Sequence, residues 1–157
     1  MKRKAIICDI DLVLLDSWEP ILIKENAMGR MSDKEAWDLY YNNLDKCKRN
    51  EWCYTLIEQL SKDSGIKILF VTGREERARK DTKAFLKFKI PVDWDLYMRE
   101  TGCLEPDHDV KRKIIKELME DYDIMFAIDD RINNCKVYQE CGIVPLHVIV
   151  NDPRFPV

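Results

Sequence analysis

Residues 6–11 read Ile-Ile-Cys-Asp-Ile-Asp, an apolar run that ends in two carboxylates two positions apart. A second carboxylate pair, Asp129 and Asp130, follows the apolar run 124–128. Ligands bind at the carboxyl ends of the strands in α/β sheets, and grouped carboxylates are costly unless a positive charge lies between them. The two pairs therefore predict a divalent metal site and, with it, a metal-dependent enzyme.

Short apolar runs alternate with helical patterns along most of the chain. The expected strands are 5–8, 66–71, 96–98, 124–128 and 143–149. The expected helices are 53–62, 75–88, 109–122 and 132–141. This alternation predicts βαβ units, and strands that are apolar throughout predict a sheet covered on both faces. We expect an α/β, Rossmann-like three-layer sandwich around a parallel sheet of about five strands.

One stretch, residues 17–52, breaks the alternation. It carries five aromatic side chains among many charges and shows no strand pattern: Trp18, Trp37, Tyr40, Tyr41 and Trp52. We interpret it as a mainly helical insertion that lies over the strand ends as a cap, within a single domain of residues 1–157. The aromatic residues are expected to form the insertion's own small core, with a stacking surface for bases as the alternative.

Composition sets a few further limits. The net charge of −3 does not by itself require a nucleic-acid partner, and segment 74–89, with seven Lys/Arg against three Asp/Glu, is expected to be a solvated helix face. No apolar segment reaches the ~18 residues that span a membrane, so we expect a cytoplasmic protein without membrane contact. The six cysteines lack metal-binding spacing and are expected to be reduced, mostly buried thiols.

The first carboxylate pair suits a divided chemical task. Alternate strand residues face the same side, so Asp9 and Asp11 can address one site. One carboxylate can attack an electrophile while the other moves protons to and from the leaving oxygen. The alternative is a pair of solvated acids at a strand end.

The second expected strand ends in Thr72, Gly73 and Arg74. A hydroxyl, a residue without Cβ and a cation that opens a helix would form a phosphate-holding turn, because glycine allows close approach and helix N-termini favour anions. The alternative is an ordinary strand-to-helix turn with local hydrogen bonds.

Helical phase distinguishes two lysines on the expected helix 109–122. At 100° per residue, Lys111 falls within the apolar arc and Lys113 falls on the polar side. A cation in the first turn of a helix is disfavoured by roughly 0.3–1 kcal/mol, so an inward Lys111 needs an anionic partner. The alternative for Lys111 is a stem along the core with its ammonium reaching solvent.

Asp129 and Asp130, together with Asp9, offer hard oxygen ligands. A site made of few carboxylates, waters and substrate phosphate is the kind that Mg²⁺ prefers. The sequence therefore predicts Mg²⁺ as the cofactor.

The order D-x-D, T-G-R, Lys, D-D resembles the haloacid dehalogenase (HAD) phosphohydrolase superfamily across essentially the whole chain. Residues 9–13 match its D-x-D-x-(T/V) strand end, although the glycine that usually follows the motif is Leu12 here. The resemblance implies that Asp9 forms an aspartyl-phosphate and that Asp11 protonates the leaving group. It also implies that Thr72 holds the phosphoryl group and that Lys111 neutralises charge. The implied metal ligands are Asp9, the backbone carbonyl of Asp11, Asp129 and, beside them, Asp130.

A narrower resemblance concerns the 3′-phosphatase domain of bacteriophage polynucleotide kinases. It is carried by Phe-Ala-Ile-Asp-Asp-Arg at 126–131 and by Met-Arg-Glu-Thr-Gly at 98–102. The resemblance implies that Arg74 and Arg99 contact substrate phosphate. An arginine early in the cap has a role in that family, and Arg30 is the loose match here.

The resemblance implies a Mg²⁺-dependent phosphomonoesterase, acting on 3′-phosphate ends of nucleic acid or on nucleotides. The sequence has no GxxxxGK(S/T) motif, so we expect a stand-alone phosphatase, a monomer, that works with a separate kinase or ligase partner. The alternatives are a phosphatase for a small metabolite or nucleoside 5′-monophosphate and, in another class, a non-catalytic phosphate-binding module.

Overall fold

The computed structural model describes residues 1–62 and 65–155 and is built around a five-stranded sheet, with the strand order β5-β4-β1-β6-β7. All four pairings in this sheet are parallel. The strands are β1 (Arg3–Cys8), β4 (Lys67–Glu75), β5 (Trp94–Arg99), β6 (Tyr122–Asp129) and β7 (Val144–His147). The predicted parallel α/β sheet is confirmed, although the strands begin or end a few residues from their expected bounds.

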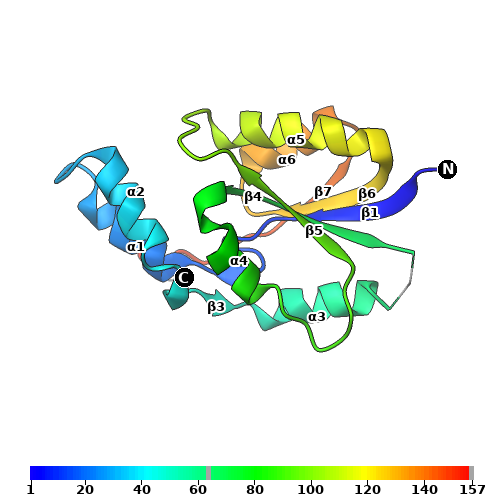
Figure 1. Ribbon diagram of the computed structural model, residues 1–157, viewed down its shortest axis with the longest axis horizontal. Coiled ribbons are helices and arrows are strands. Elements are labelled where there is room, and N and C mark those ends of the chain that lie inside the picture. The colour runs from blue at the N-terminus through cyan, green and yellow to red at the C-terminus, as the bar shows by residue number, and fades with distance from the viewer. Residues whose placement is uncertain (63–64, 156–157) are drawn as a thin grey trace.

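The two faces of the sheet are covered by different helices. Figure 1 shows α5 (Asp107–Asp121) and α6 (Ile132–Glu140) on one side, and α3 (Glu51–Leu60) and α4 (Arg79–Phe85) on the other. Residues of β1 alternate between the two cores: Ile6 and Cys8 belong to one, and Ala5 and Ile7 to the other. From Ala5 to Cys8 both faces of β1 are fully buried, as this apolar run predicts, whereas Arg3 and Lys4 at the start of the strand are exposed.

Helix α5, which carries the two lysines, is amphipathic and is followed directly by β6. Val110, Ile115 and Leu118 are buried on one face of α5. The chain then passes directly into β6 at Tyr122, so no separate loop aligns the helix with the strand. This direct connection fixes the position of the first turn of α5 relative to the end of β6.

The insertion after β1 forms a small, mainly helical cap beyond the carboxyl ends of the strands (Figure 1). It contains α1 (Trp18–Ala27), α2 (Asp33–Tyr41) and the short 3₁₀ helix η1 (Leu44–Lys46). Helix α2 begins with a capping box, in which the Ser32 hydroxyl accepts from the Glu35 N–H and the Glu35 side chain accepts from the Ser32 N–H.

The expectation of no strand in this stretch is wrong at one place. β2 (Leu15–Asp16) pairs antiparallel with β3 (Lys48–Arg49), and this two-stranded stem closes the base of the insertion. Residues 51 and 52 already belong to α3, which covers the sheet.

The turn predicted at Thr72, Gly73 and Arg74 is also wrong. Thr72, Gly73 and Arg74 do not open a helix but lie within β4, which continues to Glu75. Pairing with β5 is irregular between Thr72 and Glu75 and resumes at Glu75–Arg99. A 3₁₀ turn, η2 (Glu76–Ala78), separates the strand from the seven-residue α4. A bulge therefore replaces the expected helix N-terminus, and any anion there would meet strand backbone.

Two further expectations concern the whole chain. The six cysteines are free, four of them buried. No helix within residues 1–62 and 65–155 has the length and apolarity needed to cross a bilayer.

Candidate active site

A cavity of about 540 Å³ lies between the carboxyl ends of the strands and the cap. Asp9, Asp11 and Asp130 line it from the sheet, and residues of α1 and α2 line it from the cap. Both members of the D-x-D pair therefore face one space.

Asp9 is part of a buried charge cluster. Lys111, from the first turns of α5, is fully buried and places its Nζ 3.0 Å from Asp9 Oδ1 and 2.7 Å from Asp129 Oδ2. Lys113 points away, is 66% exposed at its side chain and pairs with Glu105 at the surface. The helix thus supplies one lysine to the cluster and one to solvent.

Asp129 is held by three further donors. Tyr138 donates its hydroxyl to Asp129 Oδ2 at 3.1 Å, and the Arg131 backbone N–H donates to Oδ1 at 3.0 Å. Asn134 Nδ2 lies 3.0 and 3.1 Å from the two oxygens. Sequence reasoning missed Asn134 and Tyr138, although their spacing of four puts two polar groups on one helical face. These contacts fix the carboxylate beside Lys111.

The cluster carries more negative than positive charge. Single carboxylate oxygens of Asp9, Asp129 and Asp130 lie within 4.8 Å of one another, and Lys111 is the ammonium between two of these groups. Burial raises the pKa of Asp9 well above its usual range, Lys111 opposes the rise, and the neighbouring carboxylates add to it. Burial and Asp129 raise the pKa of Asp130 to about 6. Three hard oxygen donors with a deficit of positive charge fit a divalent cation such as Mg²⁺.

Asp11 has a different partner. Arg74 donates from Nε to Asp11 Oδ2 at 3.0 Å and from Nη2 to Oδ1 at 2.6 Å, and Ser17 donates its hydroxyl to Oδ1 at 2.5 Å. Burial by itself would raise the pKa of Asp11, but the charge and hydrogen bonds of Arg74, with those of Ser17 and Tyr40, lower it. Asp11 is therefore held as a carboxylate.

This arrangement differs from the role expected for Arg74. Arg74 lines the cavity but is only about 2% exposed, and its Nη1 donates to Thr82 Oγ1 at 3.1 Å. Arg74 donates its hydrogen bonds to protein groups. The geometry therefore supports a role in positioning Asp11 rather than a pair of parallel hydrogen bonds to a substrate phosphate.

Gly73 is required by a neighbour on α5. A Cβ at this position would lie 2.2 Å from Asp107 Oδ1. Asp107 also accepts from Asn134 Nδ2 at 2.9 Å and lies 4.0 Å from Lys111 Nζ. The glycine thus gives room to a carboxylate that supports the cluster, and sequence reasoning assigned Asp107 no part.

Arg99 lines the cavity but is largely engaged by backbone. It donates to the carbonyls of Gly73 and Cys103 at 3.1 Å each and to that of Glu105 at 2.5 Å. Its Nη2 lies 3.6 Å from Asp107 Oδ1. Arg99 therefore organises the loop after β5 and has one nitrogen directed at the charge cluster.

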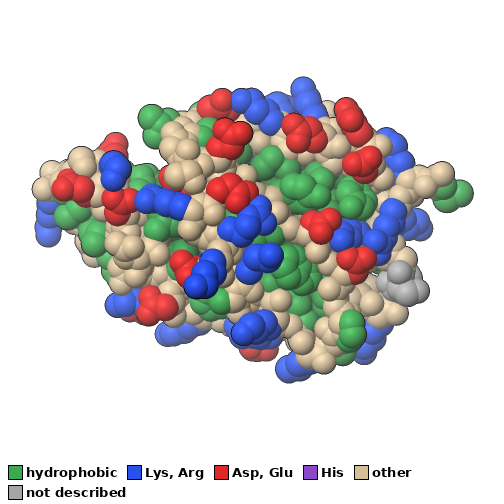
Figure 2. Space-filling view, in the orientation of Figure 1, with side chains coloured by type: hydrophobic (Ala, Val, Ile, Leu, Met, Phe, Trp, Pro, Cys, Tyr) green, Lys and Arg blue, Asp and Glu red, His purple; other side chains and the backbone are tan. Residues whose placement is uncertain are grey.

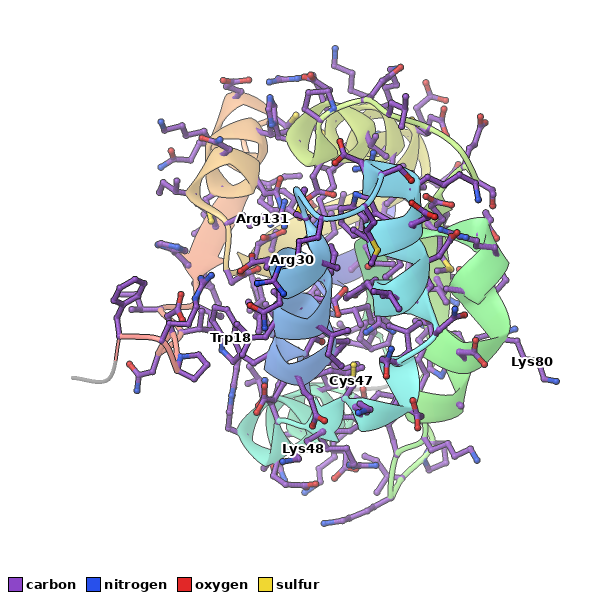
Figure 3. All side chains as sticks on the ribbon, turned by 90° about the vertical axis from the view of Figure 1, so that its left-hand side faces the viewer. Trp18, Arg30, Cys47, Lys48, Lys80 and Arg131 are labelled. Carbon is purple, nitrogen blue, oxygen red and sulfur yellow. The ribbon has the colours of Figure 1, made fainter. Side chains whose placement is uncertain are left out.

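Thr72 and Arg30, two residues expected to contact substrate phosphate, do not line the cavity. Thr72 is fully buried, and its Oγ1 accepts from the Arg74 backbone N–H at 3.2 Å. Arg30 is exposed on the turn between α1 and α2 and is not among the described residues that line the cavity. Figure 3, which looks onto the cap, labels Arg30 and Arg131; of these two, Arg131 lines the cavity.

A family of known domains shares this sequence pattern. The family described as polynucleotide kinase PNKP phosphatase domain, of the HAD type, matches residues 3–152. The chain belongs to this family. It is therefore a HAD-like phosphatase domain, and the resemblance stated from its motifs is confirmed.

Solved structures agree with the family. A chain of the Pnkp1/Rnl/Hen1 RNA repair complex has a TM-score of 0.69 and 26% identity, with 94% of this chain and 42% of that chain covered. A predicted phosphatase from Clostridium acetobutylicum has a TM-score of 0.67 and 17% identity, with 95% and 86% covered. A haloacid dehalogenase-like hydrolase from Streptococcus pneumoniae has the same score and identity, with 92% and 84% covered.

The domain spans less than half of the chain in the RNA repair complex. No curated protein matches it. The last two structures, at 17% identity, support the HAD-like fold alone.

Proposed function

We propose that this domain is a Mg²⁺-dependent phosphomonoesterase that forms an aspartyl-phosphate on Asp9 and removes 3′-phosphate groups from nucleic-acid ends. The observation that carries the proposal is the opposite environment of the two D-x-D carboxylates on one cavity. Asp9 lies against Lys111, and Asp11 is held by Arg74. The ammonium of Lys111, 3.0 Å from Asp9 Oδ1, favours the ionised Asp9 that an attack on phosphorus requires.

In the proposed first step, an Asp9 oxygen attacks phosphorus, the bond to the leaving oxygen breaks, and Asp11 gives that oxygen a proton. In the second step, water attacks the phosphorus of the aspartyl-phosphate and Asp11 accepts the water proton. The bond between the Asp9 oxygen and phosphorus breaks, which releases inorganic phosphate and restores the Asp9 carboxylate. Arg74 favours the ionised Asp11 that the second step needs. An incoming phosphate dianion raises the pKa of Asp11 toward the protonated form that the first step needs.

Lys111 neutralises negative charge beside Asp9 throughout both steps. A Mg²⁺ ion held by Asp9, Asp129, Asp130 and the backbone carbonyl of Asp11 would supply further positive charge to the phosphoryl oxygens. The excess of carboxylates over ammonium groups in the cluster supports this ligand set.

The substrate class rests on the family and on surface charge. The related chain occurs in a Pnkp1/Rnl/Hen1 RNA repair complex, which favours a nucleic-acid end and a ligase partner for this domain too. Figure 2 shows Lys and Arg side chains gathered over α4. Exposed residues of this basic surface are Arg77, Lys80, Lys83, Lys87 and Lys89. Such a surface can follow the phosphates of a longer strand.

The cavity favours a second candidate, a nucleoside-monophosphate phosphatase. About 540 Å³ is the size of a small-ligand pocket, and the cap limits its opening. The two candidates predict different dependences on the length of the substrate.

A substrate panel tests the proposal. It contains 3′-phosphorylated DNA and RNA oligomers, 3′- and 5′-mononucleotides and an aryl phosphate, each assayed with Mg²⁺ and with EDTA. We expect turnover only with Mg²⁺, and KM for the oligomers should rise more steeply than KM for mononucleotides between ~50 and ~200 mM salt. Equal salt responses with equal efficiencies would favour the mononucleotide phosphatase, and full activity in EDTA would contradict the metal site.

A further inference from the structure

The cavity is larger than the reaction requires. Its sheet end holds Asp9, Asp11 and Asp130, where the phosphoryl group would react. Its cap end is lined by Trp18, Lys24 and Trp37. A volume of about 540 Å³ leaves room at the cap end for the rest of a substrate, beyond its phosphate.

The aromatic residues of α2 have different tasks. Tyr40 is buried, and its hydroxyl helps to lower the pKa of Asp11. The Tyr41 hydroxyl accepts from the Glu75 N–H at 3.0 Å, and its ring lies 4.2 Å from the Arg77 guanidinium carbon. These two residues join the cap to the sheet, as an internal core would.

Trp37 is not used in this way. It lines the cavity and is 38% exposed, with Tyr40 as an edge-on neighbour at 5.6 Å between ring centroids. Within residues 1–62 and 65–155 its indole N–H has no hydrogen-bond partner. Trp37 thus presents a supported aromatic surface and an unused donor to the same space as the reacting carboxylates.

Lys24 adds a cation to this surface. Its Nζ lies 4.1 Å from the centroid of the Trp37 ring. Two other cap lysines form ion pairs, Lys34 with Asp38 and Lys46 with Glu19. Lys24 forms none with any described residue, although it lines the cavity. A lysine in this position is suited to an anion that enters with the substrate.

We propose that Trp37 and Lys24 form a nucleotide subsite, in which the indole stacks on the base of the phosphorylated nucleotide and Lys24 donates to a phosphate oxygen of the same strand. The inference rests on the proposed function and identifies the base as the part of the substrate that the cap binds. The flexible lysine stem allows the ammonium to move from the ring face to a phosphate oxygen. Because every base has a π-face, the subsite recognises the presence of a base and tolerates any sequence.

Matched substrate pairs test the subsite. One pair is a 3′-phosphorylated oligonucleotide with and without its terminal base, and the other is a nucleoside 5′-monophosphate against ribose 5-phosphate. We expect the base-bearing member of each pair to be preferred about tenfold or more in kcat/KM, mainly through KM, since one base–aromatic stack is worth about 5- to 150-fold.

Variants assign the preference to the residues. Trp37→Ala should bring the preference close to one, and Trp37→Phe should retain part of it. Lys24→Gln should raise KM for the oligonucleotide. Trp52→Ala is the matched control, because Trp52 is 47% exposed on α3 and does not line the cavity, and it should keep the full preference.

Each outcome separates the subsite from the proposed function. Equal kcat/KM within both pairs overturns the subsite, as does a preference that survives in Trp37→Ala. If oligonucleotides are not hydrolysed but the nucleoside monophosphate is preferred over ribose phosphate, the polynucleotide activity fails and the subsite stands. If no phosphoester is hydrolysed, tryptophan fluorescence is titrated with the 3′-phosphorylated oligonucleotide. Quenching that is unchanged in Trp37→Phe then overturns the subsite.

Discussion

Asp9 and Asp11 are two residues apart, yet the fold gives these carboxylates opposite surroundings. Asp9 shares Lys111 with Asp129, and burial with too little positive charge raises its pKa. Asp11 accepts two hydrogen bonds from Arg74 and one from the Ser17 hydroxyl, and these contacts lower its pKa. Two carboxylates of one motif can therefore differ in chemistry because their partners come from different, distant parts of the chain.

Asparagine substitutions test this comparison with the largest expected effect. Asp9→Asn should reduce turnover of every substrate to background, because the amide keeps the shape but is a poor nucleophile. Asp11→Asn should be nearly inactive on alkyl phosphates and retain more activity on an aryl phosphate, whose leaving group needs less protonation.

The measurement is kcat/KM for both variants on an alkyl and an aryl phosphate, with circular dichroism to check the fold. Clear activity in Asp9→Asn, or the same loss on both substrates in Asp11→Asn, would mean that the two carboxylates do not divide the task as proposed.

The next largest effect is expected at the two lysines of α5. Lys111→Ala should lower kcat by about 100- to 1,000-fold, the usual loss when a preorganised charge-stabilising donor is removed. It also leaves Asp9 and Asp129 without their ammonium, so the free energy of unfolding should fall by about 3–5 kcal/mol. Lys113→Ala, which removes only a surface partner of Glu105, should change either quantity little.

Steady-state kinetics and urea unfolding of both variants provide the test. A larger loss for Lys113→Ala than for Lys111→Ala would contradict the placement of Lys111 between the carboxylates.

These two regions also differ in how far sequence could predict them. The placement of Asp9 and Asp11 at one site could be predicted from the end of an apolar strand, and the inward direction of Lys111 from helical periodicity. Both predictions depend only on neighbouring residues in the chain. The partner of Asp11 is 63 residues away on β4, where a bulge replaces the expected turn. No local pattern indicates that bulge, so the phosphate role given to Arg74 came from the expected turn and from the resemblance, neither of which shows its contacts.

Residues that act through another residue were the hardest to foresee. Asn134 and Tyr138 contact Asp129, and Asp107 fits against Gly73. Each looks like an ordinary helix residue in sequence, and its importance depends on the crossing of α5 and α6 over the sheet. The shape of the cap could not be predicted from the sequence either, because the short β2–β3 stem pairs segments more than thirty residues apart.

Arg74→Lys is expected to have an intermediate effect and tests the Asp11 side of the comparison. Lysine keeps the charge but cannot donate in parallel to both oxygens of Asp11 and to Thr82. Activity should fall by about tenfold or more, and the free energy of unfolding at neutral pH should fall by about 2 kcal/mol. Arg77→Lys is the control, because Arg77 pairs with Asp38 and Glu75 at a partly exposed site.

The pH dependence of this variant has a defined sign. The folded pKa of Asp11 lies below the ordinary value of about 3.9. Its stabilising contribution is therefore complete above about pH 4 and is lost as pH falls through the lower folded pKa. In Arg74→Lys the folded pKa should return toward the ordinary value, so acidification below pH 4 should cost less stability than in the parent and in Arg77→Lys. Chemical unfolding at a series of pH values measures this dependence. If the free energy of unfolding changes equally with pH in all three proteins, Arg74 does not lower the pKa of Asp11.

The smallest expected effect lies directly after the motif. Leu12 has a φ of 62°, a left-handed conformation that glycine adopts without strain, and it stands where the superfamily usually has glycine. Leu12→Gly should stabilise the fold by roughly 1–2 kcal/mol, because it removes the backbone strain. It should also destabilise the fold by roughly 0.5–1 kcal/mol, because glycine has more conformational freedom in the unfolded chain. The net gain should be about 0.5–1 kcal/mol, seen as a higher urea midpoint with an unchanged slope. Leu104→Gly is the control, because Leu104 also lines the cavity but is not among the described residues with positive φ, and it should lose a few tenths of a kcal/mol. Equal losses in both variants would mean that side-chain contacts of Leu12 outweigh the strain, and that this domain has adapted the D-x-D loop to a residue other than glycine.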